Sequence, residues 1–87
     1  MSKPLLIAHR GLSSQAPENT MAAFKLAVDA KCDGIETDAH LTADGKIVLI
    51  HDENTLRTTG HSGQVERMTL VELATLDAGD WYDSRFA

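Results

Sequence analysis

The sequence predicts an α/β fold from two observations. Short apolar runs typical of strands alternate with an amphipathic segment of helical period. Three of the apolar runs lead directly into ionisable residues, at His9-Arg10, at Glu36-Thr37-Asp38 and at His51-Asp52. An unpaired ionisable group is costly to bury, so residues of this kind at three strand ends indicate a shared functional site.

The first third of the chain predicts a strand, a loop and a helix. Leu5–His9 is continuously apolar up to its last residue, which predicts a strand buried on both faces. After a loop with Gly, Ser and Pro, a helix is expected from about Thr20 to Lys31, capped by Asn19 or Thr20. We expect Asp33-Gly34 to end it, because glycine tolerates the left-handed closing conformation. The predicted apolar face comprises Met21, Phe24, Ala27 and Val28.

A β-hairpin is expected next. Ile35–Thr42 and Ile47–His51 have the pattern of two strands, joined by a tight Asp-Gly turn. Pairing about that turn places Asp38 opposite His51. Because opposed residues share a face of the sheet, Glu36, Asp38 and His51 would then point the same way. A register slip of one residue would break this arrangement.

The remaining residues predict a loop, a short helix and a second loop. Glu53–Met68 is polar and contains glycine, which is typical of a loop. Thr69–Glu72 has the capping-box pattern and would open a helix whose leucines face inward. Asp77–Ala87 is expected to be a loop, and it carries three closely spaced aromatic residues, Trp81, Tyr82 and Phe86.

Composition narrows the function classes. The chain has 87 residues, a net charge of −5 and a pI near 5.1, which argues against a nucleic-acid or anionic-membrane surface. The single cysteine, Cys32, excludes an intrachain disulfide framework and is expected to be a packed thiol. We see neither a membrane span nor a targeting segment at the start, so no membrane anchor is expected and the cytoplasm is the predicted location.

Glu36 and Asp38 are candidate metal ligands. They stand two positions apart on a predicted strand, so their side chains point the same way and could bind one hard cation. Oxygen ligands without cysteine favour Mg²⁺, Ca²⁺ or Mn²⁺ over Zn²⁺. Taken alone, this pair is more typical of a solvated edge strand.

His9, His51 and Arg10 add acid–base and anion-binding chemistry. Two imidazoles with pKa values near neutrality can act as base and acid across one scissile bond. The planar guanidinium of Arg10 can bind a phosphate or a carboxylate. Together with a cation, these groups suit phosphoryl transfer on a diester.

Several short motifs follow one another along the chain: His9-Arg10-Gly11, Pro17-Glu18-Asn19-Thr20, Gly34-Ile35-Glu36-Thr37-Asp38, Thr42-Ala43-Asp44-Gly45, His51-Asp52, Leu56-Arg57-Thr58-Thr59-Gly60 and Leu76-Asp77-Ala78-Gly79-Asp80-Trp81. In this combination and order they resemble the glycerophosphodiester phosphodiesterase family over nearly the whole chain.

The resemblance implies a TIM (β/α)₈ barrel, of which residues 1–87 would be the amino-terminal part and residues 52–87 an insertion capping the barrel mouth. It implies hydrolysis of glycerophosphocholine or glycerophosphoethanolamine to an alcohol and glycerol 3-phosphate, in lipid metabolism. The neighbouring glycerol hydroxyl would act as nucleophile, giving a cyclic phosphate that water opens. The implied cofactor is Mg²⁺ or Ca²⁺.

The resemblance also assigns roles to single residues. The paired catalytic histidines would be His9 and His51. The two metal ligands would be Glu36 and Asp38. The residues near the substrate would be Arg10, Glu18 and Asn19, the last of which could instead mainly cap the helix.

A complete barrel takes about 250 residues, so 87 residues are expected to hold the signature without the full site. The family's third carboxylate ligand falls outside the sequence, and no Asp or Glu here is an evident replacement. We therefore expect residues 1–87 alone to be inactive, to bind cations weakly and to self-associate through unfinished strand edges.

Two alternative functions stay open. One is a noncatalytic, truncated domain that binds a cation or a partner through those edges. The other is a phospholipase related to sphingomyelinase D, which shares the histidine and carboxylate pattern. The absence of a secretion signal and of paired cysteines in the sequence argues against the second alternative.

Overall fold

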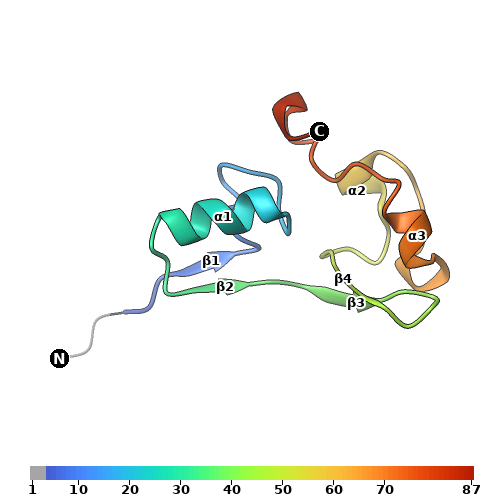
Figure 1. The fold of residues 1–87 in the computed structure, drawn as a ribbon, viewed down its shortest axis with the longest axis horizontal. Coiled ribbons are helices and arrows are strands. Elements are labelled where there is room, and N and C mark those ends of the chain that lie inside the picture. Colours follow the sequence, from blue (N-terminus) through green and yellow to red (C-terminus); the bar gives the residue numbers. More distant parts are fainter. Residues whose placement is uncertain (1–3) are drawn as a thin grey trace.

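The protein was analysed as a computed structural model that describes residues 4–87. The expectation about a targeting segment falls partly on residues 1–3, which lie outside the described residues. The molecule is flat, with extents of 48 × 29 × 16 Å. Figure 1 shows two halves side by side, one built from β1, α1 and β2 and the other from β3, β4, α2 and α3.

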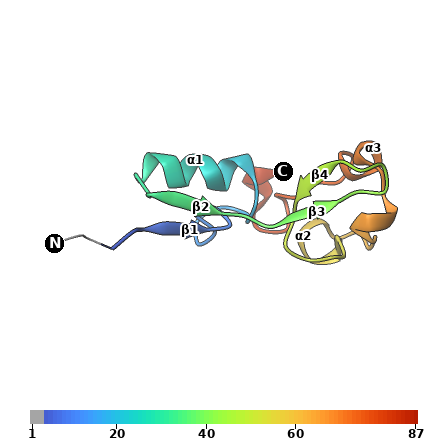
Figure 2. The same ribbon diagram turned by 90° about the horizontal axis from the view of Figure 1, so that it is seen from below.

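The first half is a β–α–β unit. Strands β1 (Ile7–His9) and β2 (Gly34–Glu36) are parallel, and helix α1 (Met21–Asp29) connects them across one face of the pair, as Figure 2 shows. The buried residues of this unit are small: Ala8 of β1 is 6% exposed, and Ala23 and Ala27 of α1 are fully buried.

The expected burial of the first strand on both faces is wrong. Leu5, Leu6 and Ile7 are 75%, 59% and 50% exposed. In the described part of the chain, β1 pairs only with β2, and α1 covers only one side of that pair. The second face and the second edge of β1 therefore lack neighbours, and its apolar side chains stay in contact with solvent.

Helix α1 begins where the sequence predicts and ends earlier. Thr20 is the N-cap, and its hydroxyl accepts a hydrogen bond from the backbone N–H of Ala23 at 3.3 Å. The predicted end at Asp33-Gly34 is wrong, because the C-cap is Ala30 and Lys31 takes the left-handed conformation (φ 59°). Asp33 instead accepts the backbone N–H of Leu6 at 2.7 Å through its carboxylate, tying the helix exit to β1.

The predicted strand Ile35–Thr42 is divided in two. Its first part is β2, and its second part is β3 (Ala39–Leu41), which pairs antiparallel with β4 (Ile47–Leu49) in a separate sheet. Thr37 and Asp38 lie between the two strands in irregular backbone. This break frees the Asp38 side chain from the strict alternation of a continuous strand.

The register of the hairpin differs from the expected one by one residue. Ala39 pairs with Leu49, and the carbonyl of Asp38 accepts the N–H of Ile50 at 2.9 Å, so Asp38 does not oppose His51. The cause is the turn. The backbone N–H of Thr42 donates to the carbonyl of Lys46 at 2.8 Å, which leaves a three-residue loop. Its last residue, Gly45, is left-handed (φ 75°).

The segment expected to be one loop contains short helices. Helix α2 spans Leu56–Thr59, and a 3₁₀ turn, η1, spans Val65–Arg67. The fully buried Thr55 and Val65 hold this segment together from within. The sequence pattern missed both elements because each is a single turn without helical periodicity.

The predicted capping box is confirmed in α3 (Leu70–Leu73). The Thr69 hydroxyl accepts the N–H of Glu72 at 3.2 Å, and the Glu72 carboxylate accepts the N–H of Thr69 at 3.2 Å. Its leucines are not fully inward, because Leu70 is 41% exposed.

The carboxyl-terminal segment folds back between the two halves (Figure 1). It ends in a 3₁₀ turn, η2 (Ser84–Phe86), and the Tyr82 ring contacts Trp81 and Phe86 edge to face, at 5.7 and 5.8 Å between centroids. The Tyr82 hydroxyl donates to the carbonyl of Ser14 at 2.8 Å, which joins this segment to the loop before α1.

Gly11 is the glycine whose replacement we expect to damage the first half. It is left-handed (φ 81°), and an added Cβ would lie 2.7 Å from the Cβ of Ala23. Gly11→Ala should lower the free energy of unfolding by about 2 kcal/mol or more, because overpacking and backbone strain add. Gly45→Ala is the matched control, since Gly45 has a similar φ and open space around it. Equal losses in chemical denaturation of the two variants would contradict the steric explanation.

Candidate active site

His9 and Glu36 lie at the carboxyl ends of the two parallel strands. They are register partners in the β1–β2 pair, and His9 Nε2 lies 3.8 Å from Glu36 Oε2. The two strands therefore present an imidazole and a carboxylate at one sheet edge, where side chains of parallel strands meet in α/β folds.

Arg10 and Asn19 both take the left-handed conformation, with φ of 57° and 55°. This conformation is uncommon for residues other than glycine and is found preferentially at functional sites. Hydrogen bonds fix it here: the N–H of Arg10 donates to the carbonyl of Glu36 at 2.7 Å, and the N–H of Asn19 donates to the carbonyl of Arg10 at 2.9 Å. The loop before α1 is thereby tied to the end of β2.

Asp38 is held by the two left-handed residues. Asn19 Nδ2 donates to Asp38 Oδ2 at 3.1 Å, and Arg10 Nε lies 3.4 Å from the same oxygen. The other arm of the Arg10 guanidinium donates from Nη1 to Glu18 Oε2 at 3.3 Å. Arg10 thus bridges two carboxylates, and its side chain is only 19% exposed. Thr20, not Asn19, is the side chain that caps α1, so Asn19 is free for this contact.

His51 lies two residues beyond the end of β4 and is oriented by its sequence neighbour. His51 Nδ1 and Asp52 Oδ1 are 2.8 Å apart. The carboxylate of Asp52 also accepts from Arg57, whose Nε and Nη2 lie 2.9 and 3.1 Å from its two oxygens. From the other side of the hairpin, His40 Nε2 donates to the backbone carbonyl of His51 at 3.0 Å.

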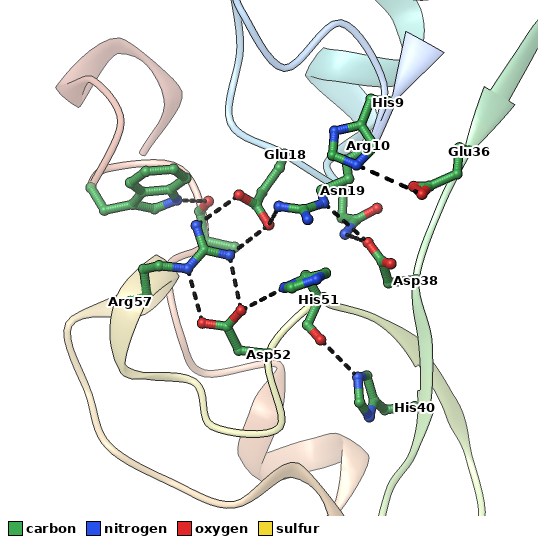
Figure 3. Close-up of polar contacts among 12 residues, drawn as sticks. His9, Arg10, Glu18, Asn19, Glu36, Asp38, His40, His51, Asp52 and Arg57 are labelled. Atoms are coloured by element: carbon green, nitrogen blue, oxygen red, sulfur yellow. Dashed lines mark hydrogen bonds and ion pairs between the residues drawn. The ribbon is translucent and has the colours of Figure 1, made fainter. Parts of the chain in front are cut away.

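Figure 3 shows these groups around one region, with side chains entering from both halves of the molecule. Glu18, Asn19 and His51 line one cavity of about 210 Å³, whose other walls are mainly apolar residues of β4 and α3. His9, Glu36 and Asp38 lie outside the lining of that cavity. Asp38 is joined to the cavity wall through its contacts with Asn19 and with Arg10, which in turn bonds Glu18.

Arg57 shifts the pKa values of two carboxyl groups. Its hydrogen bonds hold the pKa of Glu18 below the ordinary value of 4.5, against the opposing effect of burial. The pKa of Asp52 also lies far below its ordinary range, chiefly because Arg57 and then His51 donate to it. Both groups are therefore ionised at neutral pH.

These pKa shifts predict how stability depends on pH. The folded-state pKa values lie below the ordinary values of 4.5 and 3.8, so the stabilisation is fully present above those values and is lost as the pH falls through the lower ones. We expect denaturant unfolding to show constant stability above about pH 5 and a decline below it. Arg57→Met should flatten that decline, because Glu18 and Asp52 then titrate almost alike in the folded and unfolded states. An unchanged pH slope in the variant would contradict this assignment.

Sequence reasoning missed the roles of Asp52, Arg57 and His40. In the sequence, Asp52 and Arg57 stand out only as members of the motifs His51-Asp52 and Leu56-Arg57-Thr58-Thr59-Gly60. Glu18 and Asp52 are negatively charged and Arg57 is positively charged, so they could form ion pairs. Glu18 and Arg57 are 39 positions apart in the sequence, however, and no sequence pattern links them. Only the folded chain brings them within hydrogen-bond distance.

Buried polar atoms without partners test whether a cation fits this site. Among the described residues, three buried side-chain atoms have no hydrogen-bond partner: Glu36 Oε1, Asn19 Oδ1 and Arg10 Nε. All three belong to candidate site residues. The two oxygens are the kind of ligand that a hard divalent cation takes. Arg10 Nε lies 3.4 Å from Asp38 Oδ2, so it forms an ion pair without hydrogen-bond geometry. The two oxygens therefore fit a cation.

The cluster is incomplete as a metal centre by itself. Within residues 4–87 no group of three or more His, Cys, Asp or Glu side chains is arranged to hold a metal ion. Glu36 and Asp38 supply two carboxylates, and Asn19 lies against one of them.

Across residues 4–87, no helix combines the length and apolarity needed to cross a membrane.

The β–α–β unit carries an imidazole, carboxylates and a guanidinium at its carboxyl edge, which is the end of the strands where barrel enzymes place their active sites. Residues 9–87 match the glycerophosphoryl diester phosphodiesterase family. The chain belongs to this family, and residues 4–87 form part of its TIM barrel fold.

Relatives and solved structures agree with this assignment. The chain is 53% identical over 85 residues to a glycerophosphodiester phosphodiesterase of Caldanaerobacter subterraneus subsp. tengcongensis, covering 98% of this chain and 35% of the relative. The crystal structure of a glycerophosphodiester phosphodiesterase from Agrobacterium tumefaciens is 46% identical, with a TM-score of 0.93 over 97% of this chain and 36% of that one.

A third comparison involves a bound product. An Oleispira antarctica phosphodiesterase, solved in complex with the product sn-glycerol-3-phosphate, is 43% identical, with a TM-score of 0.92 over 95% of this chain and 34% of that one. The chain thus spans about a third of the length of the relatives that it matches.

Proposed function

We propose that the chain supplies the paired-histidine part of a metal-dependent enzyme that hydrolyses glycerophosphodiesters to an alcohol and glycerol 3-phosphate. The observation that carries this proposal is a pair of buried oxygens without hydrogen-bond partners, Glu36 Oε1 and Asn19 Oδ1. Such oxygens suit a cation, and the fixed guanidinium of Arg10 suits a phosphate. The product bound by the Oleispira relative, sn-glycerol-3-phosphate, carries a phosphate group of this kind.

In this proposal Glu36 and Asp38 hold a divalent cation, either Mg²⁺ or Ca²⁺. When bound, such a cation neutralises charge on a phosphoryl group and activates an oxygen nucleophile. Arg10 binds the phosphate, because its guanidinium carries a positive charge that Glu18 and Asp38 hold in one orientation. Asn19 holds the Asp38 carboxylate in place.

His9 and His51 are proposed to move the protons. Asp52 is ionised and can only accept, so the neutral His51 ring donates from Nδ1 and keeps Nε2 free for the substrate. His9 stands beside Glu36 on the other strand end. The two rings enter from different halves of the molecule (Figure 3), which suits a base and an acid working on opposite sides of a phosphorus atom.

Residues 52–87 are proposed to cap the mouth of the barrel. Arg57 reaches from this segment to Glu18, and Tyr82 reaches to Ser14. Both contacts bring the segment over the loop that carries the candidate substrate-binding residues. Variation there would change head-group preference, because loops at this end of a barrel set specificity.

The test uses a hybrid barrel, in which residues 1–87 replace the matching third of the Caldanaerobacter relative. We expect the hybrid to release glycerol 3-phosphate and choline from glycerophosphocholine, and a chelator to abolish the release. Choline released from intact sphingomyelin, with the phosphate left on the ceramide, would favour the phospholipase alternative. A folded but inactive hybrid, beside an active parent enzyme, would contradict the proposal.

Residues 1–87 produced alone are expected to be inactive and to associate. The exposed apolar strands, including Leu5–Ile7 and Ile47–Leu49, lack covering elements in the described chain. Sedimentation velocity should show oligomers that dissociate when the rest of the barrel is supplied. A stable, active monomer would contradict this expectation.

A further inference from the structure

We propose that Arg57 is a positioning residue, which fixes the acid–base group His51 and the phosphate-binding group Arg10 relative to each other. This inference rests on the proposed function, because it presumes that these two residues act on the substrate. It adds a role for a residue that lies in neither the histidine pair nor the carboxylate pair.

The guanidinium of Arg57 binds two carboxylates at once. Toward Glu18 it donates from Nη1 to Oε1 and from Nη2 to Oε2, both at 2.8 Å. Toward Asp52 it donates from Nε to Oδ2 at 2.9 Å and from Nη2 to Oδ1 at 3.1 Å. All three of its nitrogen atoms are therefore used, and each carboxylate is held through both oxygens.

On the first side, this arrangement sets the protonation pattern of His51. A carboxylate paired with arginine stays ionised and offers only acceptor oxygens. The 2.8 Å contact between Asp52 Oδ1 and His51 Nδ1 is therefore a hydrogen bond only when Nδ1 carries a proton. The neutral ring is left with a bare Nε2, and Arg57 prevents Asp52 from rotating away.

On the second side, Arg57 holds the residue that orients Arg10. Glu18 is only 9% exposed and lies between the guanidinium groups of Arg57 and Arg10. A carboxylate with so little water around it needs charged partners, and removing one of two leaves it poorly compensated. Loss of Arg57 would let Glu18 turn, and Arg10 would lose its fixed direction.

Trp81 closes the outer side of the arrangement. The Arg57 guanidinium carbon lies 5.9 Å from the centre of the Trp81 ring, and the indole N–H donates to the carbonyl of Ala78 at 2.9 Å. This cation–π contact limits the water that reaches one face of the guanidinium. We call Arg57 and its two carboxylate partners, Glu18 and Asp52, the Arg57 clamp. Arg57, Asp52 and Trp81 all belong to the segment proposed to cap the barrel mouth.

Substitutions in the hybrid barrel separate the two sides of the clamp. Asp52→Asn should lower kcat with little change in KM, because it disturbs only the His51 side. Glu18→Gln should mainly raise KM, because it disturbs the phosphate-binding side. Arg57→Met should do both, with kcat lowered by about 10- to 100-fold, the usual cost of losing a partner that orients an active group. The double variant Arg57→Met, Asp52→Asn should lose little more kcat than Arg57→Met alone.

Rescue experiments distinguish positioning from simple structural support. Arg57→Lys keeps the charge but cannot hold two carboxylates through both oxygens, so its kcat should lie between those of the unsubstituted hybrid and Arg57→Met. Added guanidinium ion should restore part of the activity of Arg57→Met. Arg67→Met is the matched control, since Arg67 is an exposed arginine of η1, and its kcat and KM should stay unchanged.

A spectroscopic measurement tests the inference without relying on activity. In ¹⁵N NMR of the hybrid, the neutral His51 ring should carry its proton on Nδ1, and in Arg57→Met it should become a mixture of both forms. An inactive hybrid with the Nδ1–H signal would end the proposed function and leave the clamp standing. Kinetics within about twofold of the unsubstituted hybrid in Arg57→Met, or the same protonation pattern in both proteins, would overturn the inference.

Discussion

His51→Ala in the hybrid barrel should lower kcat for glycerophosphocholine by about 10²- to 10⁴-fold, the usual contribution of a positioned acid–base group. The structure gives the reason. The ring is fixed from one side by Asp52, and its backbone carbonyl is fixed by His40, so Nε2 is presented in one direction. KM should change little, because Arg10 and the carboxylates that would bind the phosphate and the cation are untouched.

The control for this variant is His61→Ala. His61 is an exposed histidine near the end of α2, and its backbone carbonyl, not its ring, accepts the hydroxyl of Thr55. Removing that imidazole should leave kcat unchanged. A loss of less than about threefold in His51→Ala, or an equal loss in His61→Ala, would remove His51 from the proposed acid–base pair.

Glu36→Gln should abolish most of the activity by weakening the cation site. The substitution keeps the size of the side chain and removes its charge, and the affinity of oxygen sites for hard cations depends on the number of charged ligands. We expect the concentration of Mg²⁺ or Ca²⁺ giving half-maximal activity to rise by about tenfold or more. Excess cation should therefore restore part of the lost rate, which it would not do for His51→Ala.

Glu66→Gln is the matched control, because Glu66 is an exposed glutamate in η1, and its cation dependence should be that of the unsubstituted hybrid. Calorimetry adds a second measurement. Residues 1–87 alone contribute two carboxylates, Glu36 and Asp38, and should bind Ca²⁺ weakly. Micromolar or tighter binding by this chain alone would contradict the view that its metal site is incomplete.

Local sequence signals predicted the elements that depend on local interactions. The Thr20 cap and the Thr69–Glu72 capping box involve residues within three positions of each other, so their hydrogen bonds form wherever the chain turns into a helix. The β–α–β order followed from apolar periodicity in the same way. The short turns α2 and η1 have no such periodicity, and the sequence pattern therefore did not predict them.

The hairpin shows where local reasoning failed. An Asp-Gly pair suggests a two-residue turn, whereas the chain forms a three-residue loop ending at a left-handed Gly45. That single difference moves every pairing by one position. Asp38 still reaches Arg10 and Asn19, because it lies in the irregular stretch between β2 and β3, so its placement does not depend on the hairpin register.

The sequence by itself determined the family, the strand–helix order and the residue types of the candidate site, since each is recorded in a short motif. Only the tertiary structure decided how those motifs are connected. Glu18 and Arg57 are 39 positions apart, and their ion pair exists because the chain folds the segment after β4 back over the loop before α1. Contacts of this kind depend on the packing of whole elements, and no local pattern of charges specifies them.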